Sequence, residues 1–115
     1  MMIGSGHRLD KIVESSMQLK HIRKEDLQFG DMVLITTRNS LYSVYVLDAE
    51  HYIVSGGWFD RKGLSPVKAS IAGCTWGGNI IKVDTLAACG LRLEFGNRVL
   101  TTTIQKVAVI RGSGN

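Results

Sequence analysis

The 115-residue sequence predicts one mainly β domain, a small, strongly curved sheet or SH3-like barrel of about seven strands, with one N-terminal α-helix. Three observations predict this class. Apolar residues recur with period two from residue 31 onward, and turn residues separate these runs. Glycine, at 13 residues, is frequent enough to let short strands bend sharply.

The N-terminal region has helical spacing instead. Residues at i, i+3, i+4, i+7 and i+8 form one stripe of a helix: Leu9, Ile12, Val13, Ser16 and Met17. Basic residues follow over 20–24, which suits a helix C-terminus. We therefore expect a flexible N-terminus over 1–7, a helix at about 8–22 within a helix-and-linker segment 8–26, a β domain over 27–111, and a flexible tail over 112–115.

The first predicted hairpin is apolar on both faces. Its strands are 32–37 and 41–47, and Asn39-Ser40 is expected as a two-residue loop that places Ile35 opposite Val44 and Leu34 opposite Tyr45. One face carries Val33, Ile35, Val44 and Val46; the other carries Met32, Leu34, Tyr45 and Leu47. A half-exposed hairpin would alternate apolar and polar residues. We expect the second face to be covered, either by the N-terminal helix or by a second subunit.

The sequence ends in a second clear hairpin, after further expected strands over 52–55, 67–75 and 79–83 and a connection over 84–90. Three apolar residues alternate with polar ones in its first strand: Leu91, Leu93 and Phe95. Gly96-Asn97 is expected as a tight two-residue turn. In that register Leu100, Thr102 and Ile104 of the last strand face Leu93 and Leu91 of the first. That strand, 99–110, is expected to bend near Gln105 or Lys106.

Charge is unevenly distributed along the chain, whose net charge is +4. Residues 61–115 contain eight Lys or Arg and two Asp or Glu, a net of +6. A basic half attracts phosphate or an acidic partner. The candidate nucleic-acid-binding residues are Arg92, Arg98, Lys106 and Arg111. Aromatic residues are scarce beside them, since Phe95 is expected to point inward, so nucleic-acid binding is the alternative hypothesis.

Two groups of residues are candidate ligand-binding positions. The first is the polar tip of the first hairpin, whose donors and acceptors suit a small polar ligand or a phosphate: Thr37, Arg38, Asn39, Ser40 and Tyr42. The second is the pair of tryptophans beside Gly-Gly pairs, which suits a stacking platform: Trp58 after Gly56-Gly57, and Trp76 before Gly77 and Gly78. The competing interpretations are a hairpin tip that satisfies its own backbone and core tryptophans packed on glycine bulges.

No catalytic residue, metal ligand or cofactor is predicted, and we expect the protein not to be an enzyme. The sequence lacks a C-x-x-C pair and a nucleophile motif, and Cys74 and Cys89 are expected to be reduced, buried small residues. The longest stretch without a charged residue, Ala69 to Ile81, is far shorter than the ~20 residues of a membrane span. With no secretory leader visible, we expect a cytoplasmic protein without a membrane partner.

Four strings of the sequence resemble those of a family of small bacterial proteins: Thr37-Arg38-Asn39-Ser40-Leu41-Tyr42, Ser55-Gly56-Gly57, Gly73-Cys74-Thr75-Trp76-Gly77-Gly78 and Thr101-Thr102-Thr103. The family has an Asn-Ser-x-Tyr hairpin, a Gly-x-Thr-x-Gly-Gly turn and a Thr-rich last strand, and the similarity spans about residues 27–110. The resemblance implies a compact, single-domain bacterial protein. It implies no activity, because the family has no established one.

Together these observations predict a non-catalytic binding or protein-interaction module that associates with itself or with a protein partner. The doubly apolar hairpin and the lack of a catalytic set motivate this prediction.

Overall fold

The structure, a computed structural model, describes residues 17–77 and 80–112, which form a mainly antiparallel β fold. These ranges contain eleven strands: β1 (Met17–Leu19), β2 (His21–Arg23), β3 (Met32–Thr37), β4 (Leu41–Val46), β5 (Tyr52–Gly56), β6 (Val67–Ala69), β7 (Ile71–Thr75), β8 (Ile81–Lys82), β9 (Thr85–Ala88), β10 (Arg92–Phe95) and β11 (Leu100–Ile110). A 3-10 turn, Lys24–Asp26, and a short helix, α2 (Gly57–Arg61), complete them. The mainly β prediction is confirmed, with more and shorter strands than expected.

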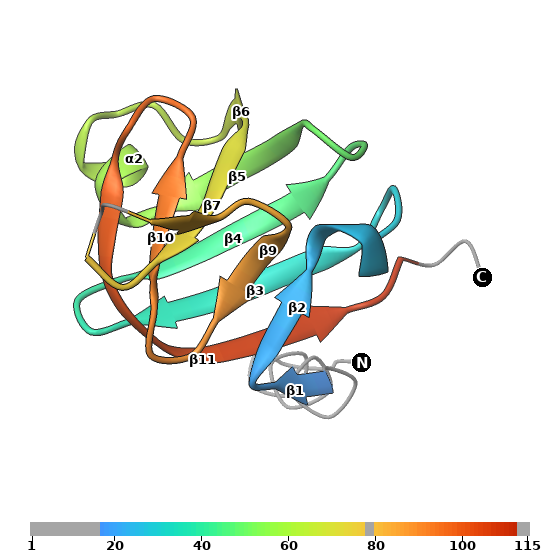
Figure 1. The fold of residues 1–115 in the computed structure, drawn as a ribbon. Coiled ribbons are helices and arrows are strands. Elements are labelled where there is room, and N and C mark those ends of the chain that lie inside the picture. Colours follow the sequence, from blue (N-terminus) through green and yellow to red (C-terminus); the bar gives the residue numbers. More distant parts are fainter. Residues whose placement is uncertain (1–16, 78–79, 113–115) are drawn as a thin grey trace, which may run out of the picture.

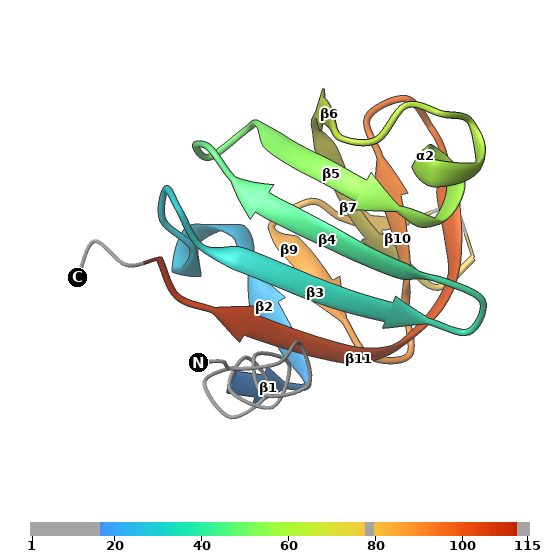
Figure 2. The same ribbon diagram turned by 180° about the vertical axis from the view of Figure 1, so that it is seen from behind.

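The sheet folds over on itself along β11. Its strand order is β6-β5-β4-β3-β11-β10-β7-β8, with β1 also beside β11, and β2 and β9 form a separate pair. Figures 1 and 2 show two layers, β3, β4 and β5 in one and β7, β9 and β10 in the other. The path ends at β6 and β8 without joining them, so the described strands form no closed barrel.

Apolar side chains fill the space between the layers. Three aromatic rings connect the layers. The ring centroid of Phe95 on β10 lies 5.6 Å from that of Tyr42 on β4 and 4.8 Å from that of Phe59 on α2. Such pairs add about 0.5–1.5 kcal/mol each beyond the burial of their area. Gly57 makes room for this cluster, since a Cβ there would collide with the Tyr42 ring.

The first hairpin confirms the predicted faces but not the predicted register. The residues predicted for one face are buried, and the other face is half-buried. Ile35 pairs with Tyr42 rather than Val44, because the two-residue loop is Arg38-Asn39 and not Asn39-Ser40: the Thr37 N–H donates to Ser40 O, and the Ser40 N–H donates to Thr37 Oγ1. The register moves by two residues, which keeps each side chain on its expected face.

The last hairpin also differs in register. Leu100 opposes Glu94 and is 38% exposed, whereas we predicted that it would face Leu93. The turn is wider than two residues: the Phe95 N–H donates to Val99 O, and Arg98 adopts a positive φ of 73°. The expected bend in the last strand is confirmed by the register shift between Ile104 and Lys106.

The N-terminal helix expected over 8–22 is wrong for residues 17–22, and its first part lies outside the described residues. Residues 17–19 pair with β11 and residues 21–23 pair with β9. Pairing with open strand edges outweighs the local helical preference here. The expected connection over 84–90 is likewise wrong, because it contains β9. No helix in the described ranges is long and apolar enough to cross a membrane.

A buried carboxylate joins the loop before β3 to the residues that follow β11. Asp31 accepts hydrogen bonds from the Gln28 N–H (2.9 Å), the Gly112 N–H (2.8 Å) and Arg111 Nη1 (2.8 Å). Burial by itself would raise the pKa of Asp31, but these three donors outweigh it and hold the pKa below its ordinary value.

We predict that Asp31→Asn lowers the free energy of unfolding by about 1–3 kcal/mol at neutral pH, because buried donors lose an acceptor. Since the folded-state pKa is lowered, the contribution of Asp31 is present above the ordinary pKa of 3.8 and is lost as the pH falls below it. Urea unfolding from neutral to acid pH measures both effects. Glu50→Gln, at an exposed carboxylate, is the control. Equal stability of the two variants would contradict the role of Asp31.

Candidate functional site

The structure brings together five of the residues predicted for ligand binding, at the tip of the first hairpin. A cavity of about 80 Å³ there is lined by five predicted residues, Thr37, Asn39, Ser40, Tyr42 and Trp58. Its other lining residues are Arg61, Leu100, Thr101 and Thr102. The cavity is large enough for a few waters, but not for an organic ligand.

The polar groups around this cavity bond to one another. The Asn39 N–H donates to Thr102 Oγ1 (3.3 Å), and the Trp58 N–H donates to the Tyr42 hydroxyl (3.2 Å). Arg61 Nη1 lies 3.4 Å from Ser40 Oγ. These bonds fasten the hairpin tip to β11 and α2. The geometry therefore favours the self-satisfied hairpin tip over a ligand site.

The remaining predicted residues do not line this cavity, although Arg38 also belongs to the hairpin tip. Arg38 is exposed, and its N–H donates to Thr103 O. Trp76 and Gly77 line a different depression, and Gly78 lies outside the described residues. Of the predicted nucleic-acid-binding residues, Arg98 precedes β11 and Arg111 follows it. They flank opposite ends of this 11-residue strand, which bends between them. Arg92 is exposed on β10, and Lys106 lines a depression beside β1.

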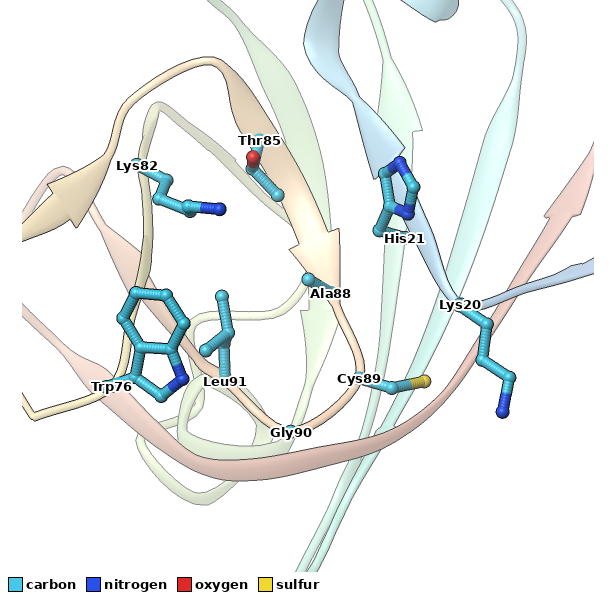
Figure 3. A pocket seen from close by; sticks show the side chains of 9 residues that line it. All are labelled: Lys20, His21, Trp76, Lys82, Thr85, Ala88, Cys89, Gly90 and Leu91. Atoms are coloured by element: carbon cyan, nitrogen blue, oxygen red, sulfur yellow. The ribbon is translucent and has the colours of Figure 1, made fainter.

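A groove of about 370 Å³, here called the Trp76 groove, is shown in Figure 3. Its lining residues come from the ends of several strands: Lys20, His21, Trp76, Lys82, Thr85, Ala88, Cys89, Gly90 and Leu91. Trp76 and Lys82 stand on one side of the β9–β10 turn, and His21 and Lys20 stand on the other. Ala88 and Leu91 give the groove an apolar floor between them.

The walls of the groove combine an exposed indole with positive charge. Trp76 is 66% exposed, and Lys82 Nζ lies 5.4 Å from its ring centroid. Lys20 adds a second ammonium group, and no Asp or Glu is among the lining residues within the described part of the chain. Asp84, on the β8–β9 turn, lies 3.8 Å from Arg23. The groove is thus an electropositive site beside a flat aromatic surface.

Neither cysteine is placed as an activated nucleophile. Burial raises the pKa of Cys74 to about 11, and its thiol donates to Leu86 O. Cys89 is half-buried, with Gln105 O 3.5 Å from its sulfur. His51 Nδ1 lies 3.0 Å from Asp48 Oδ1 in the turn between β4 and β5. In the sequence His51 is more than 20 residues from either cysteine. Within residues 17–77 and 80–112, no three His, Cys, Asp or Glu side chains are grouped to hold a metal ion.

The sequence pattern indicates Trp76 but not the residues on the other side of its groove. The sequence predicts a helix end at Lys20 and His21 and a connection over residues 84–90. In the structure the Cys89 N–H donates to Lys20 O (2.8 Å), which sets β2 against the β9–β10 turn. This contact is non-local, and no short-range pattern indicates it.

Comparisons with family models, curated proteins and solved structures find no significant match. The resemblance to a small bacterial family therefore stays a prediction.

We predict that one thiol per chain reacts in the folded protein. Cys89 borders the groove, whereas Cys74 is buried with a raised pKa. Titration with a chromogenic disulfide reagent at pH 8 should show one fast thiol, and a second only after unfolding in guanidinium. Cys89→Ser should abolish the fast reaction. Two fast thiols, or a fast reaction that survives this change, would contradict the burial of Cys74.

Proposed function

We propose that the protein is a non-catalytic binding module whose Trp76 groove holds an anionic ligand with a flat, aromatic part. The exposed Trp76 indole beside the Lys82 ammonium carries this proposal. An indole left in water loses the stabilisation of burial, and a flat partner stacked on it recovers part of that. The neighbouring cations supply attraction for a phosphate or carboxylate.

The groove also has the composition of a ligand site. Ala88 and Leu91 offer apolar contact, while Thr85, His21 and the two lysines offer polar contact around it. Small-molecule sites have this mixture of an apolar surface and a few polar groups. The hairpin-tip cavity, at about 80 Å³, lacks the space.

ATP is a suitable probe, because it joins a flat base to a polyanion. We predict that ATP changes the tryptophan fluorescence of the protein, and that Trp76→Ala weakens binding roughly tenfold through loss of stacking. Lys82→Gln should weaken it by up to about fivefold, as expected for one exposed charge. Calorimetric titration measures both affinities.

Lys68→Gln is the matched control, because Lys68 is an exposed lysine on β6 that lines none of these depressions. It should bind ATP as the wild type does. If ATP does not bind, or binds equally well to the Trp76→Ala protein, the proposed site is wrong.

A second proposal is self-association through the outer face of β3, β4, β5 and β11. Pairing sets one row of half-buried apolar residues across these strands: Ile110, Met32, Tyr45 and Ile53. Phe29 extends this row, since it is 71% exposed and meets Tyr45 edge-on at 6.0 Å. Contiguous exposed apolar surface of this kind favours an interface. A second copy of the chain supplies an equal apolar face, which is the geometry of a two-fold dimer.

We predict that Phe29→Lys raises the dissociation constant of a homodimer at least tenfold, because a charge would be buried at its interface. Light scattering across a concentration series measures this. Leu64→Lys, at an exposed apolar residue in the α2–β6 loop, should leave the dimer unchanged. A wild-type protein that is monomeric at every concentration would exclude self-association.

A further inference from the structure

We infer that the Trp76 groove is the middle of a longer path that binds single-stranded nucleic acid. This inference rests on the proposed function of the groove and specifies its ligand.

The groove continues at both ends. A depression of about 190 Å³ shares Trp76 with it and extends past Gly77 to Ile80, which is 73% exposed. A depression of about 180 Å³ shares Lys20 and Cys89 with it and extends along β1 and β11 to Lys106. Three adjoining depressions thus form one path over the surface, open to ligands longer than one nucleotide.

The cations are spread along this path. Lys82 is on β8, Lys20 lies between β1 and β2, and Lys106 is on β11. A single phosphate is best held by donors that converge on one point, whereas a chain of phosphates is matched by cations in series. Among the described residues that line the three depressions, none is acidic. The path is therefore complementary in charge to a polyanion.

The indole selects among polyanions. Proteins that bind single strands combine a basic groove with aromatic side chains on which bases stack. Trp76 provides that surface at the junction of two depressions, and Ile80 adds exposed apolar contact beyond it. An acidic peptide or a sulfated polysaccharide has no flat ring in its repeating unit to place on Trp76. The pattern of side chains thus favours a nucleic acid over these alternatives.

A thymidylate hexamer, ATP and heparin test the inference with the full-length protein. We expect the hexamer to bind more tightly than ATP and to change the fluorescence of the wild type but not of Trp76→Ala, which should bind roughly tenfold more weakly. A plot of log affinity against log salt should have a slope near −2, for about three phosphate contacts at ~0.7 each. Lys20→Gln, Lys82→Gln and Lys106→Gln should each lower this slope by about 0.7. Lys68→Gln should leave it unchanged.

The outcomes separate this inference from the proposed function. If ATP binds at Trp76 and the hexamer binds no more tightly, the groove is a small-ligand site and the inference is wrong. If neither binds, both are wrong. If heparin binds as tightly as the hexamer with equal loss in Trp76→Ala, the site does not read bases and the inference is wrong. Circular dichroism of each variant confirms that a loss of binding is not a loss of fold.

Discussion

One strand, β11, supplies hydrogen-bond partners to both layers, and the remaining structure depends on the bend within it. Its first part pairs with β10, and its second part pairs with β3 and β1. The register shift next to Gln105 lets one strand serve two layers that face each other. The bend also receives the β9–β10 turn, since the Gly90 N–H donates to Ile104 O (2.9 Å) and the Ile104 N–H to Leu91 O (2.7 Å). The same constraint that closes the core therefore fixes the floor of the Trp76 groove.

The opposite wall of the groove is held by the β2–β9 pair. Lys24, which follows β2, adds two hydrogen bonds to this strand pairing. Its N–H donates to Asp84 O, and its Nζ donates to Ile71 O (2.7 Å). These bonds lie at the base of β2 and hold the backbone, not the groove side chains. Lys20 and His21 are therefore positioned by main-chain contacts and their side chains stay exposed. A site of this construction places its ligand-facing groups on a rigid frame without using them to stabilise it.

The sequence predicted what depends on local periodicity. The period of two in residues 32–37 and 41–46 correctly indicated two strands and assigned each residue to a face, because burial follows the alternation of side chains. The registers of the two hairpins were not predicted, because each depends on its turn. Thr37 bonds through its side chain in the first turn, and Arg98 adopts a positive φ in the second, and strand periodicity encodes neither feature. Strands β1, β2 and β9 were missed because they exist through pairing with distant partners. For the same reason the sequence indicated Trp76 but not Lys20, which only the fold brings to its groove.

The exposure of the groove residues decides what kind of affinity they can provide. An exposed ammonium near water contributes about 1 kcal/mol or less to binding one charge, and salt screens it further. A single cation–aromatic pair such as Lys82 and Trp76 is therefore a weak site for a small anion. Affinity rises when several such contacts act on one chain, because each added contact is made by a ligand already held nearby. Lys20, Lys82 and Lys106 lie on separate elements along one path, so a ligand must span them to use all three. The weakness of each contact and their linear arrangement together favour a polymer over a small anion.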